Sequence, residues 1–332
     1  MRAAPRFRFY ADAQRYLDRI GRERPRPGAA RTSGMQPRRQ VYCKSCNDLP
    51  KGVSGAQLYL PLGPVAGIEA STKALLEHLH REAVGPFTAD DAASLLGLDR
   101  ARAARLVRYL AAQGWLSRVR RGLYITVPLG TRSPASHRED SWITAATLFS
   151  PSYIGGWSAL EHWSLTEQIF RTVMVVTAQR VRARDVTIQE MPYRLRHVPA
   201  SRHFGLRVAW RGRVRVNVSD PSRTIIDVLD DPSCGGGIRH AADAIAEYWR
   251  SEHRDENALA AYARRVGNRT VFKRLGYLLE ALHLDSPRLV DTCRRLMSTG
   301  LSPLDPAVRR AGRIVKRWNL RVNVTVAPLE PS

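Results

Sequence analysis

Residues 99–127, DRARAARLVRYLAAQGWLSRVRRGLYITV, decide the fold of the first half of this chain. In the first part of this stretch, apolar residues recur every three or four positions, which predicts an amphipathic helix over 100–113. Asp99 is a suitable N-cap for that helix, and Gly114 a suitable end. Two short alternating runs then flank the RRG sequence at 120–122, which is typical of a β-hairpin with a basic tip. The stretch therefore predicts a helix followed directly by a hairpin.

Two shorter helical patterns precede this helix, over 71–82 and from Thr88 to Gly97. The turn between the second and third helices is only Gly97-Leu98-Asp99, which is the short, glycine-containing connection of a helix-turn-helix. With the hairpin added, the sequence predicts a winged helix-turn-helix. The apolar positions expected on the inner faces of the three helices are Ala74, Leu75, His78 and Leu79, then Ala92, Ala93, Leu95 and Leu96, then Ala103, Leu106, Val107 and Leu110.

Positive charge concentrates on the third helix and the hairpin. Residues 99–128 hold seven arginines and one aspartate, a net charge of +6, whereas residues 69–98 carry −3. The arginine fork suits phosphates and guanine edges, and a recognition helix presents such residues to the major groove. We expect Arg102 and Arg105 to read base edges and the other arginines to position the DNA backbone. The complete predicted DNA-binding set is Arg100, Arg102, Arg105, Arg108, Tyr109, Arg118, Arg120 and Arg121.

The whole chain is also basic. It has 332 residues, with 53 Lys and Arg against 30 Asp and Glu, for a formal net charge of +23. This balance favours a polyanionic partner, and the length suits two domains and a tail. The N-terminus lacks the apolar core of a secretory signal, and no apolar run is long enough to span a membrane. Four cysteines do not form a disulfide framework, so a cytoplasmic setting without membrane contact is expected.

Residues 1–68 read as a basic, disordered arm with 13 basic and 4 acidic residues and seven prolines. Met35 lies within the arm, so either Met1 or Met35 is a candidate start. Cys43 and Cys46 form a CxxC pair, which resembles half of a zinc knuckle. No further ligands follow at a suitable spacing, so no metal site is predicted there.

Residues 129–332 read as a mixed α/β domain with a helical C-terminal part. The overall fold class is therefore α+β, with a winged helix-turn-helix domain at 69–128 preceding this domain. Strands are expected at 172–177, 193–198, 206–210, 214–218 and 320–326, and helices at 140–149, 222–229, 238–250, 256–265, 271–283 and 287–298. Residues 153–163 are expected to form a strand-like entry followed by a helix.

This second half contains no convincing catalytic motif. Ser158 lacks the second glycine of a nucleophile elbow, and the glycines at 235–237 lack the lysine of a phosphate-binding loop. There is no Asp-x-Asp pair for two metal ions. Asp220, Arg223 and Asp227 are explained by a helix cap with an ion-pair partner, and His162 by a core position. We expect no enzyme activity, no cofactor and no metal.

Four segments in order resemble the AbiEi antitoxins of type IV toxin–antitoxin systems. They are RRGLYITVP at 120–128, YIGGWSALEHWSLTEQIFRTVMVVT at 153–177, VNVSDPSRTIIDVLDDPSCGGGI at 216–238 and NRTVFKRLGYLLEAL at 268–282. The resemblance spans about residues 69–326 and leaves the basic arm unmatched.

This resemblance implies a bacterial autorepressor of an abortive-infection system, whose winged helix binds inverted repeats in its own promoter. It further implies that the C-terminal domain supports repression and opposes a nucleotidyltransferase-type toxin, although some relatives are regulators without a toxin gene. Arg102, Arg105 and the hairpin arginines carry over as DNA contacts. Two alternatives remain open, a DNA-targeted nuclease or other DNA-processing enzyme and a protein-binding module.

Overall fold

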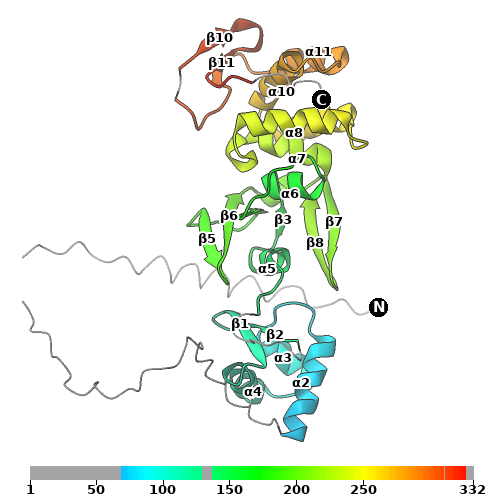
Figure 1. Cartoon of the computed structure of the whole chain (residues 1–332), viewed down its shortest axis with the longest axis vertical. Coiled ribbons are helices and arrows are strands. Elements are labelled where there is room, and N and C mark those ends of the chain that lie inside the picture. Colours follow the sequence, from blue (N-terminus) through cyan, green and yellow to red (C-terminus); the bar gives the residue numbers. More distant parts are fainter. Residues whose placement is uncertain (1–68, 129–136, 310, 327–332) are drawn as a thin grey trace, which may run out of the picture. The chain divides into compact units, whose positions relative to one another are not determined.

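The computed structural model of this chain describes residues 69–128, 137–309 and 311–326, which form a mixed α/β structure with several sheets (Figure 1). The predicted basic arm, with Met35, Cys43 and Cys46, lies outside the described residues. The predicted domain limits at 68 and 128 therefore stay predictions. Among the described residues, none of the helices has the length and apolar character that crossing a membrane would require.

Three helices and a hairpin come first along the described chain. Helix α2 spans Ala70–Glu82, α3 spans Ala89–Leu96 and α4 spans Arg100–Ala112. Strands β1 (Leu116–Arg120) and β2 (Leu123–Thr126) pair antiparallel. These bounds agree with the predicted helices and hairpin to within one or two residues.

The local signals that separate α3 from α4 behave as predicted. The Thr88 hydroxyl accepts the Asp91 N–H, and the Asp91 carboxylate accepts the Thr88 N–H, which completes a capping box. Gly97 ends α3 in the left-handed conformation, with φ 62° and ψ 31°. A non-glycine residue adopts this conformation at a cost, so the turn depends on glycine at that position.

One predicted helix face was wrong. In α2 the buried residues are Leu76 and Leu79, whereas Ala74 is exposed and Leu75 is only half-buried. The buried stripe thus lies about one residue further along the helix than the apolar spacing indicated. His78 is half-buried because its ring Nε2 donates to the Leu95 carbonyl of α3 at 3.1 Å.

A six-stranded sheet forms the centre of the second half, in the order β5-β6-β4-β3-β8-β7. Strand β3 pairs antiparallel with β4 and parallel with β8, and β4 pairs parallel with β6. The outer strands β5 and β7 each form an antiparallel hairpin with their neighbours. The strands are β3 (Ser152–Ile154), β4 (Val173–Thr177), β5 (Asp185–Ile188), β6 (Met191–His197), β7 (Leu206–Arg211) and β8 (Val214–Ser219).

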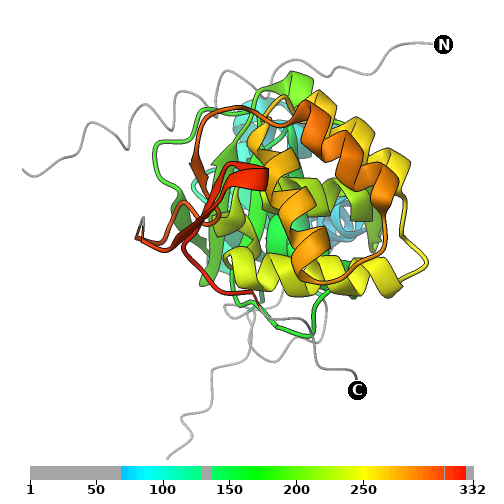
Figure 2. The ribbon, with the colours of Figure 1, turned by 90° about the horizontal axis from the view of Figure 1, so that it is seen from above.

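Helices α5 and α6 flank the early strands, and the remaining helices form a bundle with one large buried core (Figure 2). The predicted helices are all present. They are α5 (Ser141–Leu148), α6 (Gly156–His162), α7 (Pro221–Asp230), α8 (Ile238–Arg250), α9 (Glu256–Val266), α10 (Thr270–Ala281) and α11 (Pro287–Leu296).

A small three-stranded sheet packs against this bundle. It consists of β9 (Ser302–Pro303), β10 (Arg313–Val315) and β11 (Leu320–Val322), so the predicted strand at 320–326 is shorter than expected. Trp318, just before β11, is fully buried, and its indole N–H donates to Glu280 of α10 at 2.7 Å. A Cβ atom added at Gly276 would lie 2.1 Å from the Trp318 ring, so the indole occupies the space of a missing side chain.

Candidate nucleic-acid interface

The outer face of α4 presents a row of arginines because its other face is fully buried. The Asp99 carboxylate accepts the Arg102 N–H at 2.9 Å and so fixes the start of the helix. Ala103 and Val107 are completely buried from that start onward. The helical period then leaves the predicted outward positions exposed, namely Arg102, Arg105, Arg108 and Tyr109.

Acidic side chains in the described part of the chain do not compensate the charge of these arginines. Among the residues that the structure describes, no carboxylate lies within ion-pair distance of the guanidinium groups of Arg102, Arg105 or Arg108. Tyr109 adds an aromatic ring that is 46% exposed beside them. Exposed, uncompensated guanidinium groups keep all their donors available for phosphates or base edges.

Arg100, the first residue of α4, is an exception. Its Nε lies 2.7 Å from the Asp90 carboxylate of α3, and both side chains are largely exposed. An exposed pair of this kind contributes only about 0–1 kcal/mol, so it constrains Arg100 weakly. A phosphate would nevertheless have to compete with Asp90 for the Arg100 guanidinium. This distinguishes Arg100 from Arg102, Arg105 and Arg108.

The hairpin adds cations next in the sequence. Arg118 is exposed on β1 opposite Tyr124, and the register shifts between Arg118 and Arg120. Arg121 is exposed at the tip, beside Gly122 with φ 79°. Arg120 is half-buried and already has an interaction, so its donors are less available than those of Arg118 and Arg121.

The cluster of Asp220, Arg223 and Asp227 is structural, as the sequence indicated. Asp220 caps α7 by accepting the Arg223 N–H at 2.7 Å and also accepts the Tyr262 hydroxyl at 2.8 Å. The buried Arg223 guanidinium donates to Asp227 from Nε at 3.1 Å and from Nη2 at 3.0 Å. Both carboxylates are therefore engaged within the protein.

Two further positions that the sequence raised have structural explanations. The Ser158 hydroxyl is buried and accepts the Met174 N–H at 2.9 Å. Gly236 and Gly237 have positive φ and lead into α8, whose first N–H, at Ile238, donates to the Asp305 carboxylate at 2.9 Å. A protein carboxylate thus already occupies the position that an anion would take at this helix N-terminus.

The interpretation of His162 as a core residue was wrong. Its side chain is exposed at the end of α6, although the ring packs edge-on against Trp142 at 5.2 Å. Partial burial and the nearby Arg211 guanidinium lower the pKa of His162. The sequence pattern placed it in the core because tryptophans flank its helix, but the rings that contact it, Trp142 and Trp163, pack edge-on and leave it exposed.

No group of three His, Cys, Asp or Glu side chains within 69–128, 137–309 and 311–326 is arranged to hold a metal ion. The two cysteines in this part, Cys234 and Cys293, are free thiols in buried positions. Burial raises the pKa of each thiol to about 12, which keeps both thiols protonated and unreactive at neutral pH.

The comparison with known families gives a match over this first part of the chain. Residues 73–127 match the model of a family described as "Transcriptional regulator, AbiEi antitoxin". No curated protein matches the chain. That family is one of regulators rather than enzymes, and its model covers α3, α4, the hairpin and most of α2. The match confirms the resemblance to the AbiEi antitoxins over residues 73–127.

Proposed function

We propose that this protein is a DNA-binding autorepressor and the antitoxin component of a type IV toxin–antitoxin system. Helices α2 to α4 and the β1–β2 hairpin would act as a winged helix-turn-helix, with α4 as recognition helix. The observation that carries the proposal is the row of exposed arginines on α4 that have no acidic partner among the described residues. The family match at 73–127 supports the regulator and antitoxin roles.

The proposal assigns different tasks to the arginines. Arg102 and Arg105 lie in the N-terminal half of α4, which is the part of a recognition helix that reaches base edges. Arg108, Arg118 and Arg121 would hold phosphates and set the register on the duplex. Arg100, Tyr109 and Arg120 would have secondary roles, since Arg100 is paired with Asp90 and Arg120 is half-buried.

A mobility-shift titration on the DNA upstream of the protein's own gene tests this proposal. The double variant Arg102→Ala/Arg105→Ala is expected to lose about 1–3 kcal/mol of binding free energy per arginine, together with the preference for this DNA over a scrambled duplex. The matched control is Arg288→Ala/Arg294→Ala, which removes two exposed arginines from α11 and the same net charge. Equal losses in the two double variants would contradict the assignment of α4 as the reading helix.

The antitoxin role needs a separate test, because it depends on the family match alone. We expect the gene to adjoin one for a nucleotidyltransferase-type toxin, and co-expression of this protein to restore the growth that the toxin arrests. The Arg102→Ala/Arg105→Ala variant should repress its promoter poorly. Growth arrest that persists with this protein present would contradict the antitoxin role without affecting the DNA-binding role.

A further inference from the structure

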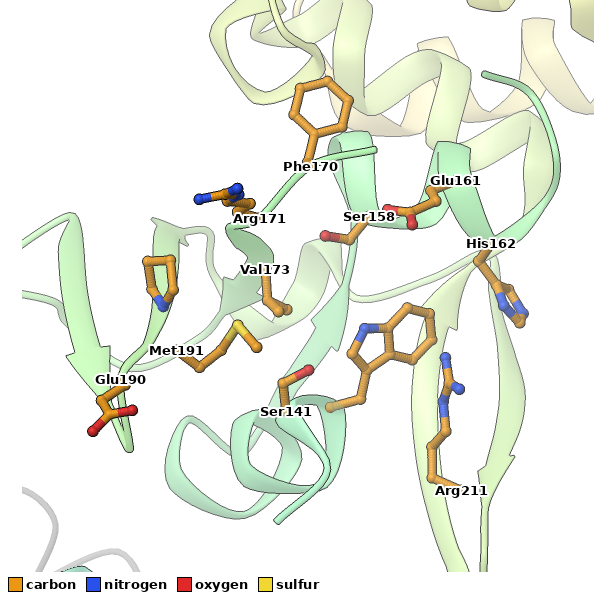
Figure 3. Close-up of a pocket in the computed structure, with 12 residues that line it drawn as sticks. Ser141, Ser158, Glu161, His162, Phe170, Arg171, Val173, Glu190, Met191 and Arg211 are labelled. Atoms are coloured by element: carbon orange, nitrogen blue, oxygen red, sulfur yellow. The ribbon is translucent and has the colours of Figure 1, made fainter. Parts of the chain in front are cut away.

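A pocket of about 590 Å³ opens beside the central sheet, between α5, α6 and strands β4, β6 and β7 (Figure 3). Its volume falls within the range of about 300–1,000 Å³ that is usual for small-molecule sites. Trp142, Val173 and Met191 give it apolar walls, and Phe170 adds a second aromatic ring. All the lining residues come from 141–211, so the pocket is independent of the candidate nucleic-acid interface.

One arginine of the pocket is fixed in place but not paired. The Arg211 guanidinium lies 4.2 Å from the centre of the Trp142 ring, which is a close cation–π stack. Its Nε is buried and has no hydrogen-bond partner among the described residues. Figure 3 shows the side chain extending from β7 toward His162. The terminal nitrogens of this guanidinium form no ion pair within the described residues, so they remain available to an acceptor atom in the pocket.

A second donor comes from Ser158 on α6, which is only 6% exposed. Its oxygen accepts the Met174 N–H, and its own hydrogen has no acceptor among the described residues. The exposed Arg171 supplies further donors at the edge of the pocket. Three hydrogen-bond donors, two of them cationic, therefore line the same space.

The charges that remain unpaired favour an anion. Glu190 also lines the pocket, but it is 3.1 Å from Arg138 and thus already compensated. Burial and Arg211 lower the pKa of His162, so this ring carries less positive charge than an ordinary histidine. Arg171 and Arg211 then face only Glu161, which leaves one positive charge in excess.

We propose that this pocket binds a small organic anion with a planar apolar body, that is, an aromatic carboxylate or phosphate ester. The ring would lie against the apolar walls formed by Trp142, Val173 and Met191. The anionic group would accept from the terminal nitrogens of Arg211 and from Ser158, while Arg171 adds positive charge at the edge of the pocket. Nothing in this proposal depends on DNA binding.

Calorimetric titration of the full chain at constant ionic strength tests the proposal with three probes of similar shape, namely benzoate, phenyl phosphate and benzamidine. We expect benzoate or phenyl phosphate to bind with 1:1 stoichiometry and the cationic benzamidine to bind at least ten-fold more weakly. The stronger of the two anions identifies the natural head group as a carboxylate or a phosphate. Absence of binding by both anions at millimolar concentration would overturn the proposal.

Variants locate the site. Arg211→Gln should weaken the anion at least ten-fold, because a charge-assisted hydrogen bond is lost. The matched control is Arg207→Gln on the same strand, where the guanidinium stacks on Trp163 at 5.6 Å outside the pocket and should be dispensable. Ser158→Ala, which removes only a hydroxyl, should weaken anion binding several-fold. This variant tests the location of the site if Arg211→Gln does not fold. Equal effects of the Arg207 and Arg211 variants, or an unchanged affinity in Ser158→Ala, would overturn the assignment.

Discussion

The outer arginines of α4 and the arginines that pair with the aspartates of α7 have the same side chain in opposite settings. Arg102, Arg105 and Arg108 are exposed and face no acid among the described residues. Arg223 is fully buried and pairs with Asp227 of α7. Arg196 is 15% exposed and lies beside Asp227, Asp230 and Asp231. The formal charge of +23 counts both groups alike, but only the first group is available to a partner.

The buried group shows what enclosing an arginine requires. Arg223 donates twice to Asp227, which accepts in addition the Tyr153 hydroxyl at 3.0 Å. Burial alone would lower the pKa of Arg223, but Asp227 reverses this and raises it. Likewise, burial favours a higher pKa for Asp230, and the Arg196 guanidinium holds that pKa below its ordinary value. Arg102, Arg105 and Arg108 have no such compensation among the described residues, which is compatible with the external contact proposed for them.

Removing one buried carboxylate should give the largest effect. Asp227→Asn leaves Arg223 enclosed without its counter-charge, so we expect the free energy of unfolding to fall by about 3–5 kcal/mol. Urea denaturation followed by circular dichroism measures this loss. Arg105→Ala should change the same quantity by no more than about 0.5 kcal/mol, since that side chain is exposed.

The double variant Arg223→Met/Asp227→Leu sharpens this prediction. Replacing both charges removes the desolvation cost along with the attraction, so the double variant should be more stable than Asp227→Asn. If Asp227→Asn lowers the free energy of unfolding no more than Arg105→Ala does, the contrast between the buried and the exposed arginines is wrong.

An intermediate effect is expected at the hairpin. If Arg118 and Arg121 hold phosphates, replacing either by alanine should weaken binding to all duplexes about equally and reduce the slope of log affinity against log salt by about 1. Arg317→Ala serves as control, because that exposed guanidinium is already paired with Glu280 at 2.7 Å. Mobility shifts at several salt concentrations measure the slope, and a slope that Arg317→Ala changes as much would contradict the prediction.

The smallest effect concerns pH. Burial, followed by the nearby Arg223 guanidinium, lowers the pKa of His203. The unfolded chain therefore takes up this proton more readily, so His203 costs stability as the pH falls through its unfolded value of about 6.5. Asp230, whose pKa is held low, contributes its stabilisation throughout that range and loses it only in strong acid.

His203→Phe keeps a ring against Tyr153, at 5.2 Å in the native protein, and removes the titration. The decrease in stability between pH 7.5 and 5.5 should therefore be smaller in this variant, as measured by denaturation at each pH. His283→Asn, which replaces an exposed histidine with a residue that tolerates its φ of 55°, should leave the decrease unchanged. An equal or steeper decrease in His203→Phe would contradict the lowered pKa of His203 in the folded protein.

Local signals made much of the fold predictable. Thr88, Gly97 and Asp99 each act on atoms within a few residues, and α3 and α4 begin and end where these residues indicate. Strand β5 was missed because its four residues alternate weakly and are held as an edge strand by β6. The buried face of α2 was misplaced because its neighbours, which lie elsewhere in the sequence, decide which side is covered.

Predicting the sites was harder, because a site joins distant residues. The arginines of α4 were identifiable, since they share one helix and the helical period places them together. The pocket was not, because Arg211 and Trp142 lie on separate elements and their stacking has no local signature. From the sequence, Ser158 and His162 were considered only as catalytic candidates, and both were set aside. In the structure both residues line the pocket.

Gly276 and Trp318 also have a consequence for biosynthesis. The ribosome makes α10 well before it reaches Trp318, yet the space over Gly276 fits that indole. Until Trp318 has emerged, this side of the helical bundle exposes apolar surface that the finished protein covers. Translation that stops before this codon should therefore yield an incompletely packed product, a ready substrate for proteases.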